Sequence, residues 1–228
     1  MRFLLDIELW VDRKEDPDVL KYSIPYIHFF AGNPENPCID KLFAKVNKHH
    51  QFFIPNKSWE IKIKQYWGDK LQSYKRNKLD HSKLDLYSIQ KISKKSLPNG
   101  FIIKEIDLKT VEFINQNISN YFSLYFGSPA EFMNKGVGYC IKKGDDLASF
   151  ATCFLPFKDK LEVQVITLKK YRRKGFAFVV CAKLIEYCLL RKITPCWDAC
   201  NESSLMLALK LGYSNPMLYD CYYWQINY

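Results

Sequence analysis

A basic turn between a strand-like segment and a long apolar segment is the feature that most constrains the fold of this chain. Residues 161–168 alternate in polarity, as a half-buried strand does, and they lead directly into the basic segment 169–177. Residues 178–190 are then apolar except at Lys183 and Glu186, which predicts a helix buried on most of its sides. This succession of strand, turn and buried helix favours an α/β protein.

The start of that helix has the character of a phosphate-binding site. The first turn of a helix leaves about four backbone N–H groups without partners at the positive end of the helix dipole, where phosphate binds readily. Gly175 and the small Ala177 would let phosphates approach the backbone closely. The charged side chains beside them are Arg172, Arg173 and Lys174. Neither the three glycines of a dinucleotide fingerprint nor the Gly-Lys-Ser/Thr of a P-loop is present.

Composition places the chain among ordinary globular proteins. Its 228 residues allow one large domain or two small ones, and its hydrophobic content of 48% and charged content of 25% are typical. The chain has no run of about 18 apolar residues, and its first segment becomes charged too soon for an export signal. Cysteines such as Cys153, Cys181 and Cys188 fall in apolar patterns, as small buried side chains do. We expect a cytoplasmic protein without a membrane span or a metal site.

The formal net charge of +10 attracts anionic partners, whether nucleic acid, a membrane surface or a phosphorylated cofactor. Many of the lysines are scattered, as on a solvated surface. Charge is the only support for nucleic-acid binding, because no helix-turn-helix or aromatic nucleic-acid signature accompanies it. Such a protein would show salt-sensitive affinity for DNA or RNA. We therefore expect partners other than nucleic acid and membranes.

A polar, basic stretch at 93–100 ends in turn residues and suggests a junction between two regions. We predict an α/β region over 1–97 and a second domain over 98–228. In the first region we expect strands at 26–32 and 51–54, a helix at 37–46, and a helix at 59–66 capped by Ser58. In the second we expect strands at 100–107, 137–141 and 147–154, a long helix at 108–126 and a short helical stretch at 131–133.

The segment after the apolar helix completes a recognisable pattern. Residues 194–200 predict a strand, Asn201 caps a helix that ends at Gly212, and Tyr213 follows. With this context, the spacing of Arg172, Gly175 and Ala177 resembles the acetyl-CoA motif of the GNAT superfamily of N-acetyltransferases. The segments PCWDACNESS at 195–204, ALKLGY at 208–213 and GVGYC at 136–140 are similar to one bacterial branch, in which an α/β region precedes the GNAT core.

The resemblance implies a GNAT fold, in which a mixed central sheet is flanked by helices and preceded by a smaller α/β region. It also implies that the backbone around Val165, Ile166 and Thr167 pairs with the pantetheine arm like an added strand. Asn201 and Ser204 would lie near the thioester end or the pantetheine, although Asn201 is also explained as a plain helix cap. The residues that would hold the pyrophosphate are Arg172, Arg173, Lys174, Gly175, Phe176 and Ala177.

The resemblance implies direct acetyl transfer from acetyl-CoA to a small amine. Glu162 is the candidate general base, since Gln164 on the same face of the strand cannot take a proton. The position where many GNAT proteins have a tyrosine as general acid is Ala208 here, so Tyr213, Tyr171 or water would have to replace it. Tyr213 is also explained as a core aromatic residue. A protein that binds CoA without turnover is therefore the alternative. The acceptor is not identified, and a homodimer stays open.

Overall fold

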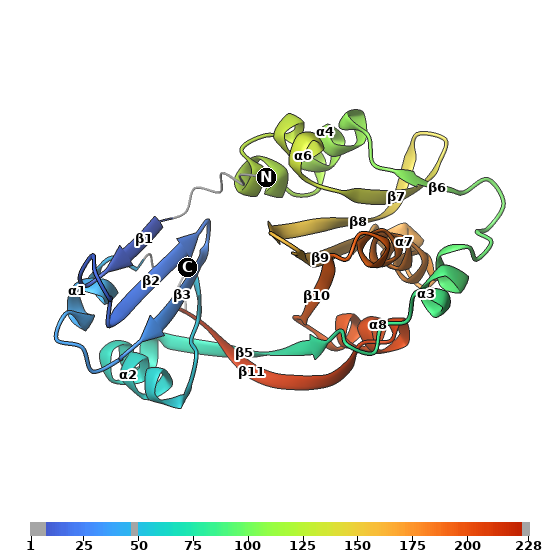
Figure 1. The fold of residues 1–228 in the computed structure, drawn as a ribbon. Coiled ribbons are helices and arrows are strands. Elements are labelled where there is room, and N and C mark those ends of the chain that lie inside the picture. The colour runs from blue at the N-terminus through green and yellow to red at the C-terminus, as the bar shows by residue number, and fades with distance from the viewer. Residues whose placement is uncertain (1–7, 47–49, 225–228) are drawn as a thin grey trace. The chain divides into compact units, whose positions relative to one another are not determined.

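A computed structural model of the protein describes residues 8–46 and 50–224, without the side chains of 155, 156 and 224. The described chain forms two compact units (Figure 1), one of residues 77–218 and the other of residues 8–76 with 219–224. The sequence predicts a junction between residues 97 and 98, whereas the two compact units meet in the chain between Arg76 and Asn77. The polar stretch at 93–100 is the segment between a helix and a strand within the first unit.

The first unit is built on a mixed sheet with the strand order β5-β10-β9-β8-β7-β6. Strands β9 and β10 are parallel, and the other neighbours in this series are antiparallel. The polarity pattern at 161–168 thus predicted a true strand. The bounds are β5 Leu71–Asp80, β6 Ile102–Glu105, β7 Gly138–Lys143, β8 Asp146–Phe157, β9 Lys160–Thr167 and β10 Thr194–Ala199.

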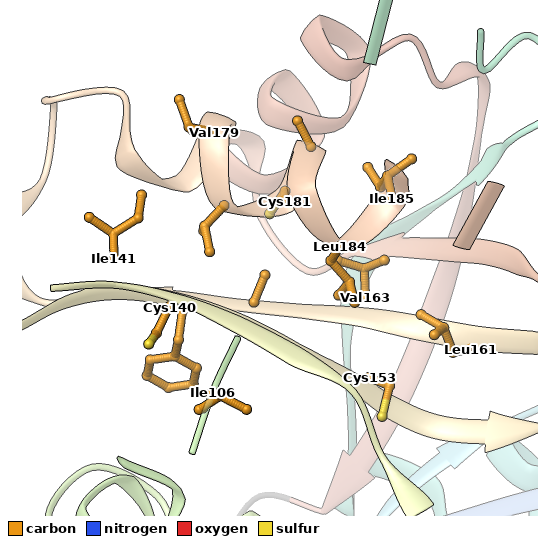
Figure 2. Close-up of a cluster of buried hydrophobic side chains, with 14 of the residues drawn as sticks. Ile106, Cys140, Ile141, Cys153, Leu161, Val163, Val179, Cys181, Leu184 and Ile185 are labelled. Atoms are coloured by element: carbon orange, nitrogen blue, oxygen red, sulfur yellow. The ribbon is translucent and has the colours of Figure 1, made fainter. Parts of the chain in front are cut away.

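Helices cover both faces of this sheet (Figure 1). The buried helix α7, Phe176–Leu190, packs on one face, and α3, Leu86–Ser93, packs against α7. Figure 2 shows Val179, Leu184 and Ile185 of α7 above the sheet, while Ile106 and Cys153 lie on its other side. The predicted burial of the helix is confirmed. The remaining helices of the unit are α4 Leu108–Asn117, α5 Tyr121–Phe126, α6 Pro129–Lys135 and α8 Glu202–Leu211.

The second unit contains neighbouring strands of a sheet in the order β1-β2-β3-β4-β11. Trp59 anchors helix α2 to this sheet, because its ring stacks on Phe30 at 5.2 Å and its indole N–H donates to the Gly32 carbonyl at 2.9 Å. Aromatic packing of this kind gives the small unit a core of its own. The bounds are β1 Glu8–Val11, β2 Val19–Ile24, β3 Ile27–Gly32, β4 Gln51–Phe53, β11 Ser214–Trp224, α1 Ile39–Ala44 and α2 Lys57–Trp67.

Two local predictions were wrong. The expected helix at 108–126 is two helices, because Ile118 leaves the helical conformation and the amides of Ile118 and Ser119 share the Ile114 carbonyl. Helix α2 is capped by Asn56 and not by Ser58, since the extended Asn56 accepts a hydrogen bond from the Trp59 amide. Across the described residues, no helix is long and apolar enough to cross a membrane.

Candidate functional site

Strand β9 has an open edge in the middle of the first unit. It pairs with β10 only from Lys160 to Glu162, opposite Thr194 to Cys196. Strand β10 then changes partner, and its residues Trp197 to Ala199 pair with β5. On the side toward β10, residues 163–167 therefore have no strand partner among the described residues. Their backbone N–H and C=O groups on that edge are available to an extended ligand, which can add to a sheet as a strand does.

The open edge leads into the basic turn. After β9 the chain makes one short helical turn, η2 Lys169–Tyr171, and then places Arg173 and Gly175 in the left-handed conformation with φ of +62° and +78°. Backbone of this kind turns successive N–H groups toward one side, where they bind anions. Helix α7 then begins at Phe176 without a side-chain cap. Among the described residues, no acceptor is found for the amides of 173–178.

Side chains hold this turn in place from two directions. The Tyr171 hydroxyl and the Lys170 ammonium both donate to the Asp146 carboxylate, at 2.7 and 2.9 Å, which lowers the pKa of that carboxyl. Phe101 packs against both Tyr171 and Phe176, with ring centroids 5.6 and 4.7 Å apart. The turn is thus fixed to the β7–β8 hairpin before any ligand binds, which lowers the entropic cost of binding.

The residues predicted to bind the pyrophosphate differ in their exposure to solvent. Arg172, Arg173, Lys174 and Gly175 are exposed, whereas the Phe176 ring is buried in the core and Ala177 is half-buried. Phe176 can therefore contribute only its backbone N–H to a ligand. A Cβ added to Gly175 would meet no heavy atom within 4 Å, so the requirement for glycine comes from its positive φ rather than from crowding within the protein.

Arg172 also connects the turn to the open edge. Its Nε donates to the carbonyl of Thr167 at 3.2 Å, at the end of β9. The structure thus places Arg172 beside Thr167, and Val165 and Ile166 precede Thr167 along the unpaired edge. All four residues belong to one continuous stretch of strand and turn.

The two predicted residues at the start of α8 have structural contacts of their own. Asn201 is the cap of that helix and accepts a hydrogen bond from the Ser204 amide at 2.9 Å. The Ser204 hydroxyl accepts a hydrogen bond from the Trp197 indole at 3.1 Å. Asn201 lies two residues after the end of β10, the strand that changes partner from β9 to β5. The predicted capping role of Asn201 is confirmed.

Glu162 occupies the last position at which β9 pairs with β10, next to the open edge. Directly opposite it are Cys196 of β10 and Phe154 of β8. Burial raises the pKa of the Cys196 thiol, and the neighbouring Glu162 charge adds to this effect. Glu162 is therefore a partly buried carboxylate at the position where β9 and β10 part.

Tyr213 and Ala208 are both in the core of the first unit. Tyr213 is only 3% exposed, and its hydroxyl donates to the Pro195 carbonyl at 2.9 Å. Burial raises the pKa of Tyr213 well above its usual value. Ala208 is fully buried, and Tyr171 is engaged with Asp146 as described above.

Two features of this site were missed from the sequence. The sequence does not mark Asp146 as part of the site, because nothing local relates it to Tyr171, which lies 25 positions later. The left-handed conformation of Arg173 also has no local signal, since arginine rarely takes a positive φ. Together the observed parts offer a strand edge for an extended ligand, an amide-lined basic turn for phosphates at one end of that edge, and the Glu162 carboxylate at its other end.

Comparison with known proteins gives concordant results. The family model described as GNAT acetyltransferase matches residues 7–222. An uncharacterised N-acetyltransferase of Bacillus subtilis, YdfB, is 29% identical over 208 residues, which are 86% of this chain and 77% of that protein. The crystal structure of a GCN5-related N-acetyltransferase-like protein from Streptococcus suis is 28% identical, with a TM-score of 0.81 over 96% of this chain and 88% of that chain. A GCN5-related N-acetyltransferase from Kribbella flavida shares the fold at 13% identity, with a TM-score of 0.59 over 90% of this chain and 86% of that chain.

Proposed function

This chain belongs to the GNAT acetyltransferase family, and we propose that it transfers the acetyl group of acetyl-CoA to the amine of a small acceptor. The observation that most strongly supports acetyl-CoA as donor is the junction of the open β9 edge with the amide-lined turn at 172–177. The open edge suits an extended pantetheine arm, and the amide-lined turn suits a pyrophosphate.

The fit can be followed group by group. The unpaired backbone of Val165, Ile166 and Thr167 would hold the pantetheine amides. The exposed side chains of Arg172, Arg173 and Lys174, with the N–H groups of Gly175, Phe176 and Ala177, would hold the phosphates. Asn201 and Ser204 would border the opposite side of the pantetheine, and both are already oriented by the α8 cap and by Trp197.

Glu162 is the acid–base residue of the proposed reaction. An ammonium cannot attack a carbonyl, so it must first lose a proton, and the Glu162 carboxylate would take that proton. The amine nitrogen then forms its bond to the acetyl carbon as the carbon–sulfur bond breaks. The excess proton on the new amide nitrogen then passes through water to the leaving thiolate. Water is our candidate proton donor, because the Tyr213 hydroxyl is buried on Pro195 and position 208 is alanine.

A protein that binds CoA without turnover is the second candidate, and Ala208 favours it. Its methyl side chain is fully buried where a tyrosine acid would be expected, so the leaving thiolate lacks that partner. Under both functions we place the protein in the cytoplasm, and the free state of all eight cysteines supports this placement.

One experiment separates these functions. Isothermal titration with acetyl-CoA measures binding, and release of free thiol across a panel of small amines measures turnover. We expect saturable binding of acetyl-CoA and thiol release that depends on at least one amine. Binding without amine-dependent release would favour the second function, and absence of binding would contradict both.

A further inference from the structure

Gln164 has a buried polar atom that no described residue satisfies. Its side-chain oxygen is buried and has no hydrogen-bond partner among the described residues. A buried carbonyl without a donor costs stability, so such a group is usually paired in folded proteins. Gln164 is two residues after Glu162 on β9, and both side chains therefore lie on the same face of the strand.

The neighbours of Gln164 do not supply the missing donor. Thr152 is directly opposite on β8, and its hydroxyl accepts a hydrogen bond from Tyr121 at 2.7 Å. Phe154 is opposite Glu162 on the same face, and Tyr125 packs edge-on against it with ring centroids 4.7 Å apart. The face thus combines a carboxylate and an amide oxygen with aromatic side chains, which favours a cationic or N–H-bearing ligand.

Gln164 as a whole is only partly buried, and the terminal torsion of a glutamine is broad. Rotation about that torsion reorients the oxygen without moving the strand. We propose, resting on the function proposed above, that the Gln164 oxygen accepts a hydrogen bond from the attacking nitrogen and thereby selects amines over alcohols and thiols as acceptors.

The selectivity follows from counting protons. An ammonium that has given one proton to Glu162 becomes an amine that still has an N–H group, and this group can remain on Gln164 while the lone pair attacks. An alcohol or a thiol that has given its proton has no donor left. Its lone pairs would then face the Gln164 oxygen and be repelled. Gln164 therefore favours nitrogen nucleophiles at the step where the acceptor is deprotonated.

Two variants test the role of the oxygen. Gln164→Met keeps the length of the side chain but removes the acceptor, and Gln164→Glu keeps an acceptor oxygen. We expect Gln164→Met to raise the KM for the amine about tenfold while the KM for acetyl-CoA stays unchanged, and Gln164→Glu to keep the KM for the amine closer to the original value. An unchanged amine KM in Gln164→Met would overturn the proposal.

The Tm of the ligand-free protein distinguishes an oxygen reserved for a ligand from one that makes a structural contact. If the oxygen is reserved for a ligand, Gln164→Met should raise the Tm of the ligand-free protein by about 2–4 °C, whereas loss of a structural contact would lower it. Ser214→Ala is the matched control, since the Ser214 hydroxyl oxygen is also buried and has no hydrogen-bond partner in the described part of the chain. It should raise the Tm similarly and leave the amine KM unchanged. A fall in Tm for Gln164→Met would count against the proposal.

A binding measurement makes the test independent of turnover. The side-chain amide of Gln164, assigned in ¹⁵N spectra by its absence from Gln164→Met, is followed while n-butylamine or 1-butanol is added to the full chain with CoA bound. We expect a saturable shift with the amine and none with the alcohol. No shift with the amine, or equal shifts with both, would overturn the proposal. Failure of the proposed function is recognised separately, because acetyl-CoA itself would then not bind. In that case the amine and the alcohol are titrated without CoA, and the Gln164 shift still tests this proposal.

Discussion

Two glycines with similar positive φ allow the role of the turn to be tested at a single residue. Gly175 has φ of +78° and Gly127, the C-cap of α5, has φ of +83°; a Cβ at either position would meet no heavy atom within 4 Å. Valine at either position should therefore cost about 1–2 kcal/mol of unfolding free energy through backbone strain alone. Only Gly175→Val should also raise the Kd for acetyl-CoA, by about tenfold or more, because it alters the phosphate site.

Urea denaturation and isothermal titration of both variants measure these two effects. Gly127→Val is the control for strain without a change in the site. Equal Kd values for the two variants would remove the turn from the binding site.

Glu162 and Tyr213 are distinguished by measuring kcat and the unfolding free energy of one variant at each position. Glu162→Gln should lower kcat and remove from its pH profile the limb that reports deprotonation of the base, because glutamine cannot take a proton. Tyr213→Phe should cost about 1 kcal/mol of unfolding free energy, since it leaves the Pro195 carbonyl without its donor, and should change kcat little. A large fall in kcat for Tyr213→Phe in a fully folded protein would restore Tyr213 as the general acid.

At the scale of elements, the hairpin of β7 and β8 supports the basic turn through Asp146. Its carboxylate is largely exposed, so its contribution to global stability is small, but it fixes the positions of Lys170 and Tyr171. Asp146→Asn should raise the Kd for acetyl-CoA about twofold to fivefold with little change in Tm. Tyr171→Phe keeps the aromatic packing on Phe101 but loses the hydrogen bond to Asp146, and it should raise the Kd for acetyl-CoA by a similar factor. An unchanged Kd in both variants would mean that the turn holds its shape without this anchor.

The elements with strong local signals were predictable from the sequence. The alternation at 161–168 and the apolar run at 178–190 give β9 and α7, and Asn201 and Gly212 bound α8 as expected. Strand β5 was missed because its sequence, LQSYKRNKLD, has charged residues on both faces and no sustained alternation. Its assignment depends on pairing with β10, about 120 residues later in the chain, which no local pattern encodes.

The candidate site also depends on strand pairing that no local pattern encodes. The amide-lined turn follows from a local motif, whereas the open edge of β9 exists only because β10 changes partner after Cys196. That exchange depends on residues 77–79 and 197–199 together. The resemblance to GNAT proteins supplied what the residues alone did not, namely that an edge should be open there.

At the scale of the whole molecule, the family match includes both units. The GNAT acetyltransferase model covers residues 7–222, and the Streptococcus suis structure covers 96% of this chain. The unit of residues 8–76 with 219–224 is therefore part of what the matched family shares, rather than an unrelated addition. Since β5 and β11 each contribute residues to both units, each unit contains parts of the same two strands.

A buried histidine in the second unit should make the stability of the molecule depend on pH. His28 is 2% exposed, and its ring bonds to Ser23 at 2.7 Å and to His50 at 3.0 Å. Burial, followed by the nearby charges of Lys21 and His50, lowers the pKa of His28 to about 3. In the unfolded chain the histidine keeps its usual pKa of about 6.5.

The unfolded state therefore binds a proton below pH 6.5 that the folded state does not bind until about pH 3. Stability is complete above pH 6.5 and should fall between these two values, by at most about 1.4 kcal/mol per pH unit for this one group. Urea denaturation at pH 7 and pH 5 measures the loss. His28→Gln should be less stable at pH 7 but should lose less on acidification, whereas His81→Gln, at an exposed histidine, should match the unmodified protein. If His28→Gln lost as much stability as the unmodified protein, the acid sensitivity would come from other groups.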